Sequence, residues 1–119
     1  MNGEAREARQ REIWFVDLDP IIGREQAGRC PALVVSVDQI GTGPSGLCIV
    51  VPLTTTQRPN PLYIEIAPPE GGIRERCWAM PEMVRSISRR RLVERWGAVR
   101  PATLEAVLGR IRLLTRPPA

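Results

Sequence analysis

Residues 13–37 read Ile-Trp-Phe-Val-Asp-Leu-Asp-Pro-Ile-Ile-Gly-Arg-Glu-Gln-Ala-Gly-Arg-Cys-Pro-Ala-Leu-Val-Val-Ser-Val, and the rest of the chain is organised around them. Two apolar strands, over residues 13–19 and 32–37, flank a loop that contains charged side chains, an amide and two glycines. Two or three turn residues are enough to connect two strands. The loop over residues 23–31 is longer and more polar than that, so we interpret it as a functional loop on a rigid base.

The length and composition indicate one globular domain. The chain has 119 residues, of which 43% are hydrophobic and 25% are charged, as in an ordinary folded protein. Residues 1–11 have no apolar face, so we expect a flexible N-terminal tail followed by a single domain over residues 12–119. No apolar run approaches the roughly 18 residues of a membrane span, and the N-terminus has no apolar signal core. We therefore predict a cytoplasmic protein without a membrane partner.

The charge suggests an anionic partner. The formal net charge is +4, and all 17 basic residues are arginines. Arginine matches phosphate geometry, so nucleic acid is a suitable partner. The alternative is a coding bias that places arginine everywhere, and only clustering separates the two. The densest cluster comprises Arg85 and residues 89–91, where a solvated face is the alternative to an RNA contact.

The chain contains no histidine, and this excludes several kinds of chemistry. Ser-His-Asp and Cys-His nucleophiles, histidine metal sites and paired-histidine RNA cleavage all require that residue. The three cysteines, Cys30, Cys48 and Cys77, have no CxxC spacing, so we expect reduced thiols. Cys48 lies in an apolar run and is interpreted as a core residue.

The remaining pattern predicts a mainly β fold. Residues 32–37 and 47–53 are continuous apolar runs, typical of strands buried on both faces, and the glycine-rich residues 38–46 connect them. Further strands are expected over residues 63–66, 77–80 and 84–87, with a helical turn over 88–92. A helix follows from Pro101, with an apolar stripe formed by Leu104, Val107, Leu108, Ile111 and Leu114. We expect a small, bent antiparallel barrel with the helix packed on it.

Several motifs occur together in one order. They are Asp17-Leu-Asp-Pro20, Gly23-x-Glu25-Gln26-Ala-Gly28-x-x-Pro31, Val51-Pro-Leu-Thr54-Thr55, and Arg85-Ser-Ile-Ser-x-x-Arg91-Leu92 before Gly97. This combination resembles the MazF/PemK family of toxin endoribonucleases, the toxic halves of bacterial toxin–antitoxin pairs. The resemblance extends over about residues 12–115.

The resemblance implies an SH3-like β-barrel with a C-terminal α-helix that forms a homodimer. It also implies a sequence-specific endoribonuclease that cuts single-stranded mRNA. The 2′-hydroxyl of the RNA is the nucleophile, no metal or other cofactor is needed, and the products carry a 2′,3′-cyclic phosphate and a 5′-hydroxyl. The implied partner is a cognate antitoxin whose acidic, disordered C-terminal segment covers the RNA groove.

The resemblance also assigns candidate catalytic residues. Glu25 and Thr54 match the family's loop glutamate and the first threonine after Val-Pro-x. Cys30 stands where the family has an arginine, and Arg29 is one position earlier. Because a thiol cannot stabilise the negative charge that develops on the phosphate, three explanations remain: Arg29 reaches in, Arg85 substitutes, or the site is impaired. The candidate RNA-binding residues around this site are Arg24, Gln26, Thr55, Arg85 and Ser86.

Other interpretations stay open at this stage. Glu25 and Gln26 could simply bond loop amides, and Met83 replaces a glutamine that family members often carry. Trp14, Trp78 and Trp96 are interpreted as core or dimer-interface residues rather than stacking platforms, since aromatic residues make up only 4% of the chain. The alternative functions are a toxin of the same fold that binds a protein target, as gyrase poisons do, and an impaired variant that only binds antitoxin or RNA.

Overall fold

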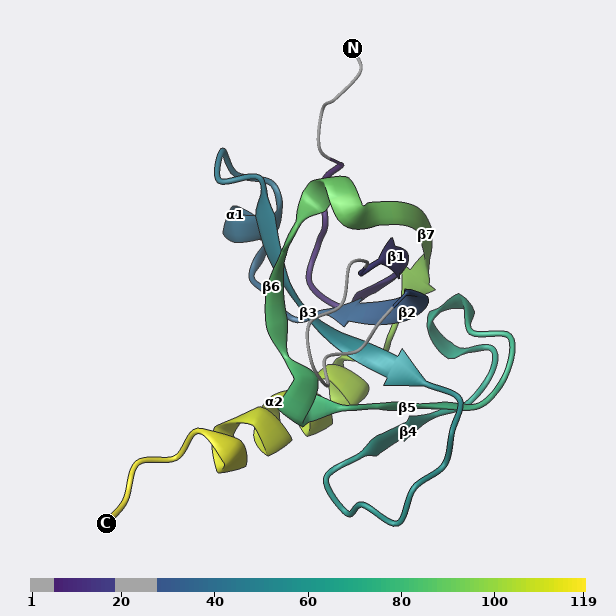
Figure 1. Cartoon of the computed structure of the whole chain (residues 1–119), viewed down its shortest axis with the longest axis vertical. Coiled ribbons are helices and arrows are strands. Elements are labelled where there is room, and N and C mark those ends of the chain that lie inside the picture. The colour runs from purple at the N-terminus through teal and green to yellow at the C-terminus, as the bar shows by residue number, and fades with distance from the viewer. Residues whose placement is uncertain (1–5, 19–27) are drawn as a thin grey trace.

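The computed structural model describes residues 6–18 and 28–119, which form a mainly β structure (Figure 1). The strands are β1 (Glu12–Asp17), β2 (Arg29–Val34), β3 (Leu47–Thr54), β4 (Ile64–Ile66), β5 (Cys77–Ala79), β6 (Arg85–Ser88) and β7 (Leu92–Ala98). The helices are α1 (Asp38–Gly41) and α2 (Pro101–Leu114), with 3₁₀ turns η1 (Glu70–Gly72), η2 (Pro81–Met83) and η3 (Arg89–Arg91). Among the described residues, no helix is long and apolar enough to cross a membrane.

The sheet bends at β3. Its strand order is β4-β5-β3-β2-β1-β7, and every pairing is antiparallel. One edge of β3 pairs with β2, while the other edge pairs first with β6 and then with β5. Because β3 exchanges one neighbour for another along its length, the sheet curls into a half-barrel. This confirms the predicted barrel-type β fold with a C-terminal helix.

The central strands are buried on both faces, as their continuous apolar runs predict. Leu33 and Val51 belong to a core cluster on one face of the sheet, and Val34 and Val50 belong to a cluster on the other face. All four side chains are fully buried. The sheet is therefore the middle layer between two apolar cores, and substitutions on either face of β2 or β3 affect packing.

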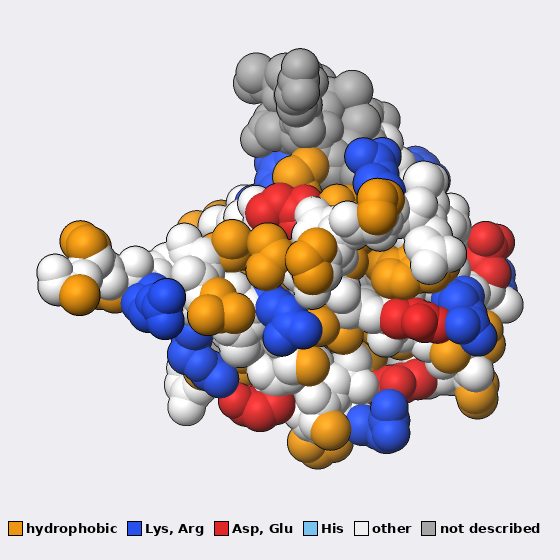
Figure 2. All heavy atoms as spheres, turned by 90° about the horizontal axis from the view of Figure 1, so that it is seen from below, with side chains coloured by type: hydrophobic (Ala, Val, Ile, Leu, Met, Phe, Trp, Pro, Cys, Tyr) orange, Lys and Arg blue, Asp and Glu red, His pale blue; other side chains and the backbone are white. Residues whose placement is uncertain are grey.

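Helix α2 covers the first of these cores. Leu104 and Val107 of its apolar stripe are buried, and Leu108 and Ile111 pack at the edge of the cluster. Leu114 is exposed, which corrects the prediction that the whole stripe packs, because the end of α2 extends beyond the sheet (Figure 1). The face in Figure 2 shows hydrophobic, basic and acidic side chains interleaved, with the C-terminal end projecting at the left.

Two elements differ from the sequence prediction. Helix α1 lies in the glycine-rich segment that we expected to be a connection between two strands, and β7 occupies residues for which the sequence indicated no strand. The ladder between β1 and β7 shifts register at Ile13/Trp14 and again at Phe15/Val16. Such bulges break the alternation of inward and outward side chains, and that alternation is the signal by which a strand is recognised.

Residues 6–11 lie along the sheet and are hydrogen-bonded to it, a contact that the sequence does not predict. Ala8 is fully buried, and its amide donates a 3.0 Å hydrogen bond to the carbonyl of Gly41. The amide of Arg11 likewise donates to the carbonyl of Val34 at 2.9 Å. A sequence without an apolar stripe can still be held along a sheet when its backbone hydrogen bonds are satisfied there.

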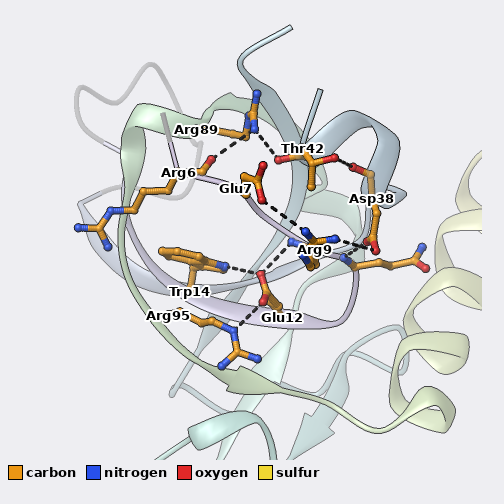
Figure 3. Close-up of polar contacts among 11 residues, drawn as sticks. Arg6, Glu7, Arg9, Glu12, Trp14, Asp38, Thr42, Arg89 and Arg95 are labelled. Carbon is orange, nitrogen blue, oxygen red and sulfur yellow. Dashed lines mark hydrogen bonds and ion pairs between the residues drawn. The ribbon is translucent and has the colours of Figure 1, made fainter. Parts of the chain in front are cut away.

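Two buried charged residues hold this segment in place (Figure 3). Glu12 accepts hydrogen bonds from the Arg9 amide at 2.8 Å, the Trp14 indole at 2.9 Å and Arg95 Nε at 2.6 Å. Burial acts to raise the pKa of Glu12, but these hydrogen bonds and the Arg95 charge outweigh it and lower the pKa. Arg89, the second of these residues, is described with the site.

Candidate active site

The ends of β1 and β2 form the base of the loop that the sequence singles out. The Leu18 amide donates a 2.9 Å hydrogen bond to the carbonyl of Gly28, and this bond joins the two sides of the loop base. Gly28 has φ +68°, a left-handed conformation that glycine adopts without strain. Three predicted site residues, Arg24, Glu25 and Gln26, lie outside the described residues.

Arg29 and Cys30 point to opposite faces of the sheet, because adjacent residues of a strand alternate. Arg29 is exposed and faces Asp17 across the β1–β2 ladder, with 3.7 Å between Arg29 Nε and Asp17 Oδ2. Cys30 is only 6% exposed and packs in the second core cluster with Trp14, Val16 and other apolar residues. Of these two residues, only Arg29 has a charged side chain at the surface.

Strand β3 ends at Thr54, which Thr55 follows, and this end of β3 lies beside the start of β2 (Figure 1). The register between β2 and β3 pairs Ala32 with Pro52, so the start of β2 runs beside the end of β3. Thr54 is half-buried opposite Trp78, and its Oγ1 accepts a 3.1 Å hydrogen bond from the Thr56 amide. Thr55 is exposed and lines a pocket together with Pro31.

Arg85 and Ser86 lie farther from this edge. Arg85 pairs with Val50 of β3, four residues before Thr54, which corresponds to about 13 Å along the strand. Ser86 pairs with Ile49 and points to the opposite face from Arg85. These two residues therefore cannot reach one phosphate from the same side of β6.

The three arginines of η3 have different surroundings, and Arg89 is the buried one. Arg89 is 5% exposed and donates hydrogen bonds to the carbonyls of Gly41 at 2.6 Å, Gly43, and Arg6 at 3.4 Å (Figure 3). Its Nε is buried and has no hydrogen-bond partner among the described residues. The alternatives considered for the triplet, an RNA contact or a solvated face, are both wrong for Arg89, because its guanidinium binds backbone inside the protein.

Arg90 and Arg91 face a shallow polar hollow of about 340 Å³, which is also lined by Asp17 and Ser88. Arg91 Nη1 donates to the backbone carbonyl of Asp17 at 3.1 Å. Because the side chain of Asp17 also pairs with Arg29, three guanidinium groups gather near the end of β1. This clustering favours an anionic ligand at the loop base.

A second, mostly apolar pocket of about 180 Å³ includes Thr55 in its wall, and no sequence pattern predicts it. Four segments far apart in the chain form it, so no local motif reveals it. Trp96 stacks on Phe15, with ring centroids 5.6 Å apart and an angle of 9° between planes. The lining residues are Pro31, Thr55, Ile73, Arg74, Glu75, Cys77 and Trp96.

The cysteines are buried and form no disulfide. Burial raises the pKa of Cys48 to about 11 and that of Cys77 to about 12. Both thiols are therefore neutral near pH 7 and are poor nucleophiles. Across residues 6–18 and 28–119, no three His, Cys, Asp or Glu side chains gather in a way that could hold a metal ion.

The fold and the site together define a class: a small, curled antiparallel β protein with guanidinium and hydroxyl groups at one end of the sheet. The family described as "PemK-like, MazF-like toxin of type II toxin-antitoxin system" matches residues 9–115. The chain belongs to this toxin family.

Individual relatives of this chain support the same family assignment. The chain is 36% identical over 101 residues to endoribonuclease MazF9 of Mycobacterium tuberculosis, covering 81% of this chain and 86% of the relative. It is 35% identical over 104 residues to the endoribonuclease toxin MazF of Escherichia coli, covering 86% and 87%.

Solved structures of Deinococcus radiodurans proteins share the fold. MazF aligns with a TM-score of 0.80 and 25% identity, covering 92% of this chain and 96% of that chain. A chain of a MazE-MazF crystal structure aligns with a TM-score of 0.74 at 25% identity, again covering 92% of this chain and 96% of that chain.

Proposed function

We propose that this toxin-family endoribonuclease cuts single-stranded RNA at a short sequence, using the RNA's own 2′-hydroxyl as nucleophile. The observation that carries the proposal is the antiparallel pairing of β2 with β3, which brings the strand start with Arg29 beside the strand end at Thr54 and the following Thr55. Both curated relatives described above are named endoribonucleases, and this supports the same reaction class here.

The proposed roles follow from the charge that develops during cleavage. Glu25 takes the proton of the 2′-hydroxyl, whose oxygen then bonds to phosphorus while the bond to the 5′ oxygen breaks and that oxygen gains a proton. Arg29 stabilises the negative phosphate oxygens, and the Thr54 hydroxyl contacts the scissile phosphate across the end of the sheet, because strand alternation places the two side chains on opposite faces. The products are a 2′,3′-cyclic phosphate and a 5′-hydroxyl.

Arg29 is suited to this role although Cys30 occupies the family's arginine position. Its ion pair with Asp17 is 3.7 Å long, and both side chains are well exposed. Such pairs contribute little to stability, about 0–1 kcal/mol, so the guanidinium can turn to a phosphate at small cost. Arg24, Gln26, Thr55, Arg85 and Ser86 are proposed RNA contacts, with Arg85 and Ser86 reaching different parts of the strand.

The proposed partners are a cognate antitoxin and a second copy of this chain. An antitoxin with an acidic, disordered C-terminal segment would compete with RNA for the arginines at the loop base. A MazE-MazF structure of a relative supports an antitoxin partner. Three reduced thiols suit the cytoplasm.

For the homodimer, light scattering should give twice the 13.3 kDa mass of one chain, and a single-chain mass would contradict it.

The alternative of a toxin that binds a protein target is not favoured, because the curated relatives described above are named endoribonucleases. An impaired variant is not favoured either. Arg29 supplies an exposed guanidinium at the start of β2, which runs beside the end of β3, and this supports an active site.

One assay tests the proposal directly. Purified protein is incubated with a long RNA in excess EDTA, and the fragment ends are analysed. We expect discrete fragments whose 5′ ends accept phosphate from a polynucleotide kinase without prior dephosphorylation. The Thr54→Ala variant should cut the same RNA about 100-fold more slowly. Absence of fragments, or 5′-phosphate ends, would contradict the proposed reaction.

A further inference from the structure

The apolar pocket beside Thr55 has a composition that suits a flat ligand. From Pro31, Thr55, Ile73, Arg74, Glu75, Cys77 and Trp96 that line it, we infer that the pocket binds one nucleobase of the RNA next to the bond that is cut. This inference rests on the proposed function. It adds a base-binding subsite to the cleavage site at the loop base.

The aromatic wall of the pocket is preorganised. Trp96 is half-buried and stacked on Phe15, and the guanidinium carbon of Arg74 lies 5.3 Å from the centroid of the Trp96 ring. The Trp96 indole nitrogen also donates to Glu94 at 3.1 Å, which fixes the ring further. Single-stranded RNA is recognised by stacking bases on aromatic rings and on arginine planes, so a fixed Trp–Arg pair is a suitable platform.

The size and polarity of the pocket favour one base over a larger ligand. Its volume is about 180 Å³, below the roughly 300 Å³ at which pockets for drug-sized ligands begin. Pro31, Ile73 and Cys77 supply apolar walls, and the neutral thiol of Cys77 adds no charge. Thr55, Arg74 and Glu75 supply donors and acceptors at the rim, where the edge of a base could be read.

The location connects the pocket to the cleavage site. Pro31 is two residues after Arg29 on β2, and Thr55 directly follows Thr54, so both walls adjoin proposed catalytic positions. One strand residue spans about 3.3 Å. A nucleotide whose phosphate contacts Arg29 therefore has a neighbouring base within reach of the pocket.

An abasic scan tests the inference. The cut site is first mapped, and an RNA oligonucleotide with a 2′-deoxy residue at that site is then used to measure binding without cleavage. Single abasic nucleotides are placed in turn at each position around the cut. For the wild-type protein, we expect one position adjacent to the cut at which losing the base weakens binding about tenfold.

The variants Arg74→Ala and Trp96→Leu should lose this sensitivity. Their binding to intact RNA falls about tenfold, and the abasic nucleotide at the adjacent position causes no further loss. Trp96→Phe retains a flat ring and should restore most of the sensitivity. The control Arg116→Ala removes the same charge from the exposed C-terminus and should leave the scan unchanged.

The outcomes separate the two proposals. If wild-type protein cuts RNA but Arg74→Ala and Trp96→Leu keep the same abasic profile, the pocket does not hold a base and only this inference is wrong. If wild-type protein neither cuts nor binds RNA, the proposed function is wrong and the inference is wrong with it.

Discussion

Arg29 and Cys30 are adjacent on β2, so their side chains point to opposite faces of the sheet. Moving an arginine by one position therefore moves its charge to the other face. An arginine at position 30 would start among Trp14, Val16 and Ala32, whereas Arg29 starts at the surface beside Asp17. Cys30 carries no charge, so in this chain the guanidinium at the start of β2 comes from the exposed Arg29. The site therefore depends on Arg29 in our account.

We predict that Arg29→Gln lowers the single-turnover rate of RNA cleavage about 100-fold, because one positioned donor to the phosphate is lost. Arg112→Gln is the matched control, since Arg112 also forms an exposed ion pair, with Glu105 at 2.8 Å. The control should cut at the wild-type rate. A Cys30→Arg variant that is about 100-fold faster than wild type would contradict the role of Arg29.

Glu12 makes folding stability depend on pH. Hydrogen bonds from Arg9, Trp14 and Arg95 overcome the effect of burial and lower its pKa below the ordinary value of 4.5. A carboxyl with a lowered folded-state pKa contributes stability above its unfolded pKa and loses that contribution as the pH falls through the folded value. The contribution of Glu12 should therefore be complete near neutral pH and disappear in acid.

We expect Glu12→Gln to lower the free energy of unfolding by about 2 kcal/mol near neutral pH, the range for hydrogen bonds to a charged group. Urea unfolding of both proteins, repeated at decreasing pH, measures this. The difference between them should shrink below about pH 4.5 as wild-type Glu12 becomes protonated. A difference that stays constant through the acid range would contradict the charge-based explanation.

At the scale of elements, Arg89 joins three segments that have no common sequence pattern. Its guanidinium binds the carbonyls of Arg6, Gly41 and Gly43, and thereby ties η3 to the N-terminal segment and to the end of α1. A run of three arginines gives no sign of this, because the acceptors are backbone atoms more than forty residues away in the chain.

We predict that Arg89→Met lowers the free energy of unfolding by about 3 kcal/mol, because it leaves buried carbonyls without donors. Arg90→Met is the control, since Arg90 is the exposed neighbour in the same turn. Thermal or urea unfolding should show little change for the control. Equal stability of the two variants would mean that the buried hydrogen bonds of Arg89 contribute nothing.

The sequence indicates elements well where one physical pattern acts over many residues. The apolar runs of β2 and β3, the alternation in β4 and the stripe of α2 each predict the correct element. Strand β7 is not predicted because its two bulges disturb the alternation of apolar and polar residues. Helix α1 is not predicted because four residues are too few to show a helical period. For the site, sequence motifs single out Thr54 and the residues around Pro31, and strand alternation explains why Arg29 and Cys30 face opposite ways.

At the scale of the whole molecule, function depends on bringing distant segments to one end of the curled sheet. The start of β2, the end of β3, the segment after η1 and the middle of β7 together line the apolar pocket. No local pattern in the sequence predicts that these four segments lie together. The +4 net charge is similarly informative only after folding, because arginines gather at the loop base while the face shown in Figure 2 carries both signs.

In our proposal, the chain cuts RNA through the substrate's own 2′-hydroxyl. The most direct measurement compares cleavage of two RNA oligonucleotides that are identical except for a 2′-deoxy nucleotide on the 5′ side of the mapped cut. We predict that the all-RNA strand is cut, and that the substituted strand remains intact while binding with similar affinity. Cleavage of both strands at the same position would contradict the account.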